Sequence, residues 1–408
     1  MPPTKAIGHL DADCFYVSAE RVRDGFLKGK PVGVLGNQGA CVIAKSYEMK
    51  AAGVKTGDPI WEAIKKCPDG VYVKRDFRWY EVLSQRLLDA VHHFSPEVEY
   101  YSIDEFFFRA VALPGRTLQQ TAEAIRDHLL HTVGVPVTVG IGRSKTLAKL
   151  ISDTAKPFGA LALLERQDER RLLQRMPVTE ISGIAARRAA TLAAYGIHTC
   201  LELADARRSL ITQVITATGE AIWWELNGEP ITPLHTQRPP HKMLSRGGSI
   251  GKATADRQRV WGFVVRNLER LIEELEFHRV WAGALTLLLQ YDDGLENGVQ
   301  EELLAPTMRF DLLLDALKRG FERVWLPGLR VSRMHLIASQ LRRPGFVQRG
   351  LFEPPEEPAR RIAQLKRDIN EHLGRFTLRS GATLTLNDIY RDREQSYDIC
   401  DIRGKICF

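Results

Sequence analysis

Hydrophobic positions in the first 165 residues follow two spacings that alternate along the chain. Apolar residues in short runs or at every second position are typical of strands, whereas apolar residues three and four apart indicate helices. The predicted strands are Ala6–Leu10, Lys30–Leu35, Cys41–Ala44, Val98–Phe108 and Pro136–Ile141, and the predicted helices are Cys14–Val22, Ser46–Ala52, Trp79–Phe94, Thr117–Thr132 and Ser144–Asp153. This alternation predicts a layered α/β domain.

The remaining residues divide into segments of different character. Residues 166–227 have short helical patterns, and the proline-rich segment Gly228–Lys242 indicates an extended linker. From Ser245 to Arg342 strands return with two helices, of which Arg257–His278 is the clearer, and Ala282–Tyr291 is the clearest strand. A tail from Pro344 onward is rich in proline and charge before a last predicted helix at Arg360–Leu373.

Charge adds a candidate partner to this picture. The 408 residues carry a net charge of +7 and a pI of about 9.1, which favours a polyanionic partner. Between Ala316 and Arg349 the only acid is Glu322, so this segment is either a solvated face or a phosphate-binding surface. Its basic residues are Lys318, Arg319, Arg323, Arg330, Arg333, Arg342, Arg343 and Arg349.

Cysteine spacing and hydropathy exclude several classes of protein. The six cysteines, at positions 14, 41, 67, 200, 400 and 407, form no C-x-x-C pair, so neither a zinc site nor a disulfide framework is predicted. No signal-like apolar run precedes Asp11, and the longest apolar stretch, near Val280–Leu289, is too short to span a membrane. We expect a soluble protein of the reducing cytoplasm with no membrane partner.

Two adjacent acids, Asp104 and Glu105, stand inside the apolar run YYSIDEFFF of residues 100–108. A regular strand would point them to opposite faces, and an exposed turn is the simplest explanation for such a pair. Asp11 ends another predicted strand, however, and neighbouring strand ends would bring the three carboxylates together. Crowded carboxylates repel one another unless cations neutralise them, and three of them suit two Mg²⁺ ions roughly 3.5–4 Å apart.

Four motifs in order give the chain a family resemblance. They are Asp11-Ala12-Asp13-Cys14-Phe15-Tyr16, Ser46-Tyr47-Glu48-Met49-Lys50, Tyr101-Ser102-Ile103-Asp104-Glu105, and Gly140-Ile-Gly-Arg-Ser-Lys145 with Ala155-Lys156-Pro157. Together they resemble Y-family translesion DNA polymerases of the bacterial UmuC and DinB groups. The segments 37–45 and 53–59 are more similar to the UmuC side.

The resemblance implies an α/β multidomain fold, the right-hand polymerase architecture. It implies an α/β palm (1–22 and 75–165), small fingers (23–74), a helical thumb with a helix-hairpin-helix (166–230), a linker (231–244), an α+β little finger (245–342) and a C-terminal tail (343–408). The glycine pair Gly140 and Gly142 lacks the spacing of a phosphate loop, so we assign it to palm architecture. In the predicted hairpin, Ala185 replaces a usual glycine, which would cost on the order of 1 kcal/mol if its φ were positive.

The resemblance also implies roles for individual residues. Asp11, Asp104 and Glu105 would be catalytic and would bind two Mg²⁺ ions, with Mn²⁺ as a substitute and the Ala12 carbonyl as a further ligand. Asp13 would be supporting or structural. Tyr16 would be the steric gate against ribonucleotides, although the helical spacing also allows it, and more so Phe15, to be a core aromatic. Predicted dNTP contacts are Phe15, Tyr16, Tyr47, Lys50 and Lys156, and the predicted roof over the nascent base pair is Cys41 and Ile43.

A short motif near the end predicts a protein partner. Gln348, Leu351 and Phe352 lie between prolines and are similar to the peptide that binds the bacterial sliding clamp (beta). The family resemblance implies primer-template DNA and dNTPs as partners, and the peptide adds this clamp. UmuD-like and RecA-like proteins are further candidates. We find no role for Cys400 and Cys407.

The expected function is low-fidelity, template-directed DNA synthesis across damaged bases, in DNA repair and the SOS response. Three alternatives stay open at this point. A nucleotide cyclase uses a similar palm without a thumb or clamp peptide. A non-catalytic, DNA-binding mutasome accessory of the same family, or a purely structural DNA-binding protein, would not need the three acids.

Overall fold

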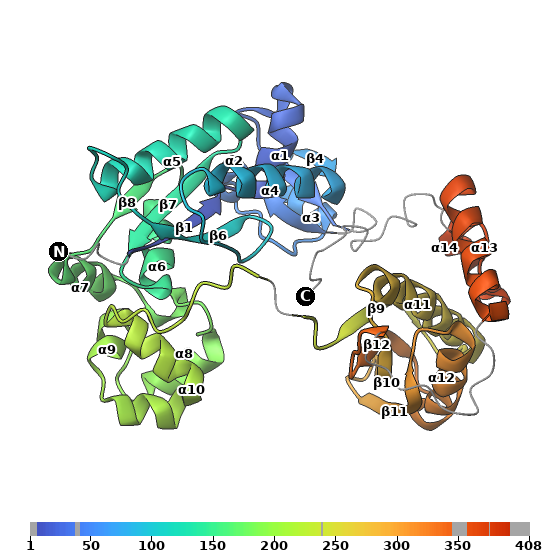
Figure 1. Cartoon of the computed structure of the whole chain (residues 1–408). Coiled ribbons are helices and arrows are strands. Elements are labelled where there is room, and N and C mark those ends of the chain that lie inside the picture. The colour runs from blue at the N-terminus through green and yellow to red at the C-terminus, as the bar shows by residue number, and fades with distance from the viewer. Residues whose placement is uncertain (1–5, 37–40, 238–239, 345–356, 375, 392–408) are drawn as a thin grey trace. The chain divides into compact units, whose positions relative to one another are not determined.

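The structure is a computed structural model that describes residues 6–36, 41–237, 240–344, 357–374 and 376–391 (Figure 1). These residues form two compact units, one within residues 6–237 and the other within residues 240–391. Across these ranges, no helix combines the length and the apolar character that crossing a bilayer requires.

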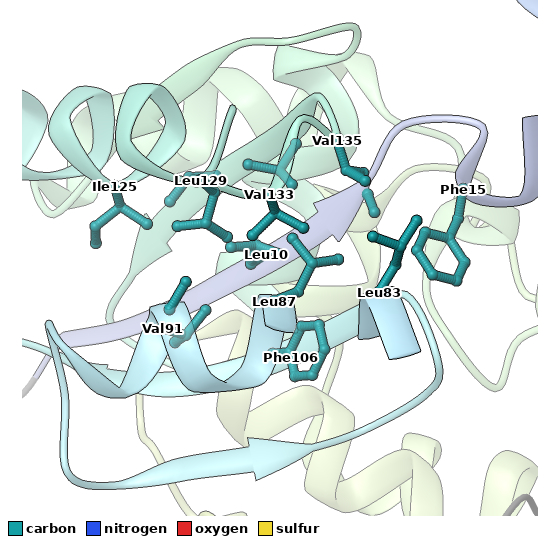
Figure 2. Packing of buried hydrophobic residues seen from close by; sticks show 14 of the residues in the cluster. Leu10, Phe15, Leu83, Leu87, Val91, Phe106, Ile125, Leu129, Val133 and Val135 are labelled. Atoms are coloured by element: carbon teal, nitrogen blue, oxygen red, sulfur yellow. The ribbon is translucent and has the colours of Figure 1, made fainter. Parts of the chain in front are cut away.

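A five-stranded sheet organises the first unit. Its strand order is β5 (Val98–Tyr100), β6 (Glu105–Ala110), β1 (Ala6–Ala12), β7 (Val137–Gly142) and β8 (Ala160–Ala162), and only the β7–β8 pair is parallel. Side chains alternate across β1, so that Leu10 faces the helices α4 (Phe77–His92) and α5 (Leu118–Val133), while Ile7 packs with Ala148 of α6 (Lys145–Ala155) on the opposite face. Figure 2 shows Leu10 and Phe106 among Leu87, Val91 and Leu129, which α4 and α5 contribute to this core.

The predicted strand Val98–Phe108 is wrong as one element, because the chain doubles back within it. The backbone N–H groups of Tyr101 and Ser102 both donate to the carbonyl of Glu105, at 3.1 and 3.0 Å, and close a turn between β5 and β6. Asp104 and Glu105 therefore stand at the beginning of a strand rather than at its end. The antiparallel pairing of β6 with β1 places them beside the end of β1.

Two glycines allow α6 to lie close to the sheet. A Cβ at Gly140 would lie 2.4 Å from the Ala148 carbonyl oxygen, and one at Gly142 would lie 3.0 Å from the Ala148 nitrogen. Ser144 caps the helix as predicted, accepting from the Leu147 N–H at 3.2 Å. The glycine pair thus serves helix–sheet packing, as the assignment to palm architecture requires.

The rest of the first unit comprises a small sheet and a helical subdomain. The sheet has the order β3 (Val42–Lys45), β2 (Val32–Leu35) and β4 (Val71–Lys74). The helical elements next to this sheet are α1 (Phe15–Arg23), η1 (Gly25–Leu27), α2 (Tyr47–Ala51) and α3 (Ile60–Lys66). Of the small sheet and these helices, α3 and β4 were not predicted from the sequence. The helical subdomain contains α7 (Arg166–Arg175), η3 (Val178–Glu180), α8 (Ala186–Ala193), α9 (Cys200–Asp205) and α10 (Arg208–Leu226).

The predicted linker is attached to the first unit where it begins. Thr232 N–H donates to the Glu225 carboxylate at 3.1 Å, and His235 N–H donates to the Glu99 carboxylate at 2.8 Å. Glu99 in turn accepts from the ammonium of Lys145, also at 2.8 Å, in a buried ion pair. The segment up to residue 235 is therefore part of the packed first unit.

The second unit combines a four-stranded antiparallel sheet with helices. The strand order is β11 (Glu296–Thr307), β10 (Ala282–Tyr291), β12 (Val331–Ser339) and β9 (Leu244–Thr254), and the helices are α11 (Arg257–Phe277), α12 (Phe310–Val324), α13 (Glu357–Leu373), η5 (Gly381–Leu386) and α14 (Asn387–Arg391). Part of the predicted tail, residues 343–408, packs into this unit. Leu386 and Thr383 are fully buried, and Leu386 belongs to the core of the unit.

The predicted helix-hairpin-helix segment has an ordinary backbone at Ala185. Its φ is −87°, so the cost that a positive φ would bring at this position does not arise. Gly183 carries the positive φ, at +95°. The turn before α8 therefore needs glycine at position 183 and not at 185.

Gly183→Ala should consequently destabilise the first unit by about 1–2 kcal/mol, the cost of holding an alanine at positive φ. Ala185→Gly, two residues away, is the matched control and should not destabilise the unit, because glycine is preferred over alanine at an N-cap. Urea unfolding followed by circular dichroism measures both. Equal unfolding midpoints for Gly183→Ala and the unsubstituted chain would contradict the assignment.

Candidate active site

The three predicted acids meet where β1 ends and β6 begins. Asp11 pairs with Glu105 in the antiparallel register, and Ala12 N–H donates to the Asp104 carbonyl at 2.9 Å. Asp11 is buried, while Asp104 and Glu105 are half-buried. The sheet topology thus joins carboxylates that lie more than ninety residues apart in the sequence.

Crowding has an electrostatic cost at Asp11. Burial, with smaller contributions from Glu105 and Asp104, raises the pKa of Asp11 to about 7, against the opposing effect of the Lys156 ammonium. Burial opposes the charge on Lys156, but its acidic neighbours Asp11 and Asp153 prevail and raise the pKa of that lysine. The site favours cations next to its carboxylates.

Two lysines supply positive charge in this structure. The ammonium of Lys156 lies 2.7 Å from Asp11 Oδ2 and 2.8 Å from Asp153 Oδ1. The ammonium of Lys149 bonds to Glu105 Oε1. Within the described part of the chain, no three His, Cys, Asp or Glu side chains form a group that could hold a metal ion as they stand.

The donor set nevertheless fits a hard divalent cation. All the candidate ligands are oxygens, namely the carboxylates of Asp11, Asp104 and Glu105 and the carbonyl of Ala12, and Mg²⁺ prefers such ligands. The lysine ammoniums mark where the carboxylate oxygens attract a cation. If these flexible side chains turned away, the same oxygens would be free for metal ions.

Ser102 holds the remaining acid. Its hydroxyl donates to Asp104 Oδ1 at 2.5 Å, and the Asp104 N–H donates to the same hydroxyl oxygen at 3.3 Å. The orientation of Asp104 is therefore set by the turn that begins β6.

The predicted steric gate, Tyr16, lies in a group of aromatic rings. Its ring stacks on Tyr80 with centroids 4.6 Å apart and meets the edge of Phe77 at 5.5 Å. The Tyr80 hydroxyl donates to Glu20 at 2.6 Å. Phe15 is only 3% exposed and belongs to the core, so its ring does not present a surface for a nucleotide.

Asp13 is held by several hydrogen bonds, and its structural role stays a prediction. It is buried and accepts from the Thr138 hydroxyl at 3.1 Å, from the Phe158 N–H at 2.8 Å and from the Tyr47 hydroxyl at 3.1 Å. Tyr47, a predicted dNTP contact, is thereby oriented, and burial raises the pKa of its hydroxyl. Lys50, another predicted contact, is exposed on α2.

The other predicted site residues have different outcomes. Cys41 and Ile43 are two positions apart where β3 begins, and both are partly exposed. Their role as a roof stays a prediction. Gln348, Leu351 and Phe352 of the clamp peptide, like Cys400 and Cys407, lie outside the described residues.

The basic segment of the second unit meets more acids than the sequence suggested. Arg319 and Arg323 on α12 pair with Glu301 of β11, and Arg330 pairs with Asp292 at 2.5 Å. Lys318 lies 3.2 Å from Asp315. Half of the predicted basic cluster is therefore partly neutralised within the unit, and its phosphate-binding role stays a prediction.

Sequence reasoning missed four residues around the acids: His9, Ser102, Lys149 and Ser152. Lys149 and Ser152 lie one turn apart on α6, which faces the same side of the sheet as Asp11 and Glu105. The predicted helix Ser144–Asp153 already contained both residues. Only the crossing of α6 over β1 could have shown that they reach the site.

Family models and relatives match most of this chain. Residues 10–153 match the model of the impB/mucB/samB family, and residues 241–351 match the model of its C-terminal domain. DNA polymerase IV 1 of Bacillus subtilis is 28% identical over 395 residues, which are 93% of this chain and 94% of that protein. Protein UmuC of Salmonella typhimurium is 29% identical over 387 residues, which are 90% and 91% of the two chains.

A solved structure supports the fold. A Y-family DNA polymerase chimera of Dbh and Dpo4 superposes with a TM-score of 0.69 at 20% sequence identity, covering 83% of this chain and 99% of the chimera. The fold class predicted from the motifs, an α/β multidomain polymerase fold, is confirmed. The nearly equal identities to DNA polymerase IV and UmuC leave the closer likeness to UmuC a prediction.

The two models of this one family together match more than half of the 408 residues, and the fold agrees with them. The chain therefore belongs to the impB/mucB/samB family, the UmuC and DinB type of Y-family DNA polymerases.

Proposed function

We propose that the chain is a DNA-directed DNA polymerase that extends primers with low fidelity across damaged template bases. The observation that carries the proposal is the register of β1 and β6, which pairs Asp11 with Glu105 and places Asp104 next to Ala12. A DNA-binding protein without catalytic activity has no need to bury Asp11 beside two further carboxylates. The names of the relatives, DNA polymerase IV among them, support the same activity.

The chain's own groups would hold and orient the reactants. Asp11, Asp104, Glu105 and the Ala12 carbonyl would hold two Mg²⁺ ions. When bound, these ions would supply the positive charge that activates the primer 3′-hydroxyl and stabilises the leaving pyrophosphate. Lys156, once released from Asp11, and the Tyr47 hydroxyl would contact the triphosphate, and the Tyr16 ring would lie under the sugar.

The domain assignment follows the same proposal. The five-stranded sheet with α4, α5 and α6 is the palm (1–22 and 75–165), the small sheet belongs to the fingers (23–74), and the helical subdomain is the thumb (166–230). The second unit contains the little finger (245–342). The partners of the whole chain would be primer-template DNA and the sliding clamp, with UmuD-like and RecA-like proteins in an SOS response.

Primer extension tests this proposal. We expect the purified chain, with Mg²⁺ and dNTPs, to extend a primer on an undamaged template and past an abasic site. Reactions without primer-template separate a polymerase from a nucleotide cyclase, which would form product from the nucleotide alone. No extension on either template, even with the clamp and partner proteins added, would favour the non-catalytic accessory instead.

A further inference from the structure

A buried histidine stands directly behind the acidic site. His9 lies on β1, two residues before Asp11, and its side chain is fully buried on the α6 face of the sheet. Its Nδ1 lies 2.7 Å from the Ser152 hydroxyl oxygen, and its ring packs on Phe107 with centroids 4.6 Å apart. Its Nε2 has no hydrogen-bond partner among the described residues and lies 3.8 Å from Glu105 Oε1.

An unpaired nitrogen in this position needs a reason. Leaving a buried polar atom without a hydrogen-bond partner destabilises the folded state, and such atoms are rare in native structures. The ring is fully buried, and a neutral imidazole carries a single N–H, on either Nδ1 or Nε2. The position of that proton decides what His9 can do.

Ser152 can set the position of the proton. Its hydroxyl has one hydrogen and two acceptors within reach, His9 Nδ1 at 2.7 Å and the Lys149 carbonyl at 2.8 Å. The Lys149 carbonyl lies inside α6, where the helical pattern already provides it with the N–H of residue 153. The hydroxyl can therefore donate to Nδ1 without leaving that carbonyl unsatisfied, and the ring proton then resides on Nε2.

In this arrangement Nε2 faces the carboxylate that Lys149 now holds. Glu105 Oε1 accepts from the Lys149 ammonium and lies within 4 Å of His9 Nε2. A cation that displaces the ammonium would leave the carboxylate in need of a donor to fix its orientation. A shift of less than 1 Å would bring Nε2–H into ordinary hydrogen-bond range of the oxygen.

We propose that His9 is a positioning residue for Glu105. Ser152 donates to Nδ1, and Nε2–H donates to the Glu105 carboxylate when that carboxylate turns from Lys149 to a divalent cation. This inference rests on the metal-binding role in the proposed function. Donors behind a metal ligand fix its orientation and raise metal affinity, and their loss typically costs about 10–100-fold.

Metal binding by the chain alone provides the first test. In a Mn²⁺ titration, electron paramagnetic resonance measures the concentration of the free ion. His9→Leu should bind Mn²⁺ at least about 10-fold more weakly than the unsubstituted chain. His9→Gln places an amide N–H at a similar reach and should recover most of the loss. Ile7→Val, on the same face of β1 and without a polar group, is the control for a packing defect and should bind Mn²⁺ normally.

The second test observes the ring itself and needs no substitution. With ¹⁵N-labelled histidine, Mg²⁺, a dideoxy-terminated primer-template and dNTP, the nitrogen shifts should show a protonated Nε2 and a bare Nδ1 for His9. A bare Nε2 in this complex, or unchanged Mn²⁺ affinity in a folded His9→Leu chain, would overturn the inference. If the unsubstituted chain neither bound Mn²⁺ nor extended a primer, the proposed function itself would fail.

Discussion

Asp11→Asn should lower the rate of nucleotide incorporation by a factor on the order of 10³ or more, because it removes a carboxylate from the predicted two-metal site. Asparagine keeps the shape of the side chain but not the charge that two cations require. The affinity for primer-template should change by less than about threefold, since it comes from phosphate contacts elsewhere. Single-turnover incorporation and DNA binding, measured in the same buffer, separate the two effects.

Asp153→Asn is the matched control for this substitution. Asp11 and Asp153 both accept from Lys156, so either change disturbs the lysine that we expect to contact the triphosphate. Asp153 is not a predicted metal ligand, and its replacement should cost no more than about 100-fold in incorporation rate, the size of a single charged hydrogen bond. Equal losses for the two variants would assign the effect to Lys156 and contradict the metal-binding role of Asp11.

Asp11→Asn should lower activity without lowering the thermal stability of the fold. The carboxylate of Asp11 is buried beside Glu105 and Asp104, and the elevation of its pKa shows that the charged form is held at a cost. A neutral side chain removes the cost of burying the charge, and with it the smaller repulsion by Glu105 and Asp104, and leaves Lys156 paired with Asp153. We therefore expect the unfolding temperature of the variant to equal or exceed that of the unsubstituted chain, as is common when a functional charge is removed.

The helices and strands around the site could be predicted because each depends on a local sequence pattern. The spacing of apolar residues in α4 and α5, the cap at Ser144 and the apolar run of β1 all depend on neighbours in sequence. The grouping of Asp11 with Asp104 and Glu105 was also predicted, although the pairing of β1 with the beginning of β6 brings them together and not the meeting of two strand ends. The family motifs then supplied roles that no spacing alone could give.

What sequence reasoning missed depends on contacts between distant segments. The turn between β5 and β6 interrupts a run whose composition reads as one strand, and the carbonyl of Glu105 stabilises it. The pairing of Lys149 with Glu105 requires the crossing of α6 over the sheet, which Gly140 permits. Likewise, Leu386 is buried because it packs against the core of the second unit, and the residues next to it in the sequence give no sign of this burial.

Tyr16→Ala should remove most of the discrimination between deoxyribonucleotides and ribonucleotides. Forcing a 2′-hydroxyl against a packed ring costs about 1–3 kcal/mol, so the preference should fall by on the order of 10–100-fold when the ring is absent. The ring can exclude the hydroxyl only if it cannot move aside. The Tyr16 ring is held in place by stacking on Tyr80, whose hydroxyl donates a hydrogen bond to Glu20.

The measurement is the ratio of kcat/KM for a dNTP to that for the rNTP with the same base. Tyr16→Phe keeps the ring and its stack on Tyr80 and should retain the discrimination of the unsubstituted chain. If Tyr16→Ala retained it as well, the ring would be a core aromatic of the Phe77 and Tyr80 cluster and not the gate. Loss in both variants would instead assign the discrimination to the phenolic hydroxyl, so the pair of variants separates the surface of the ring from its polar end.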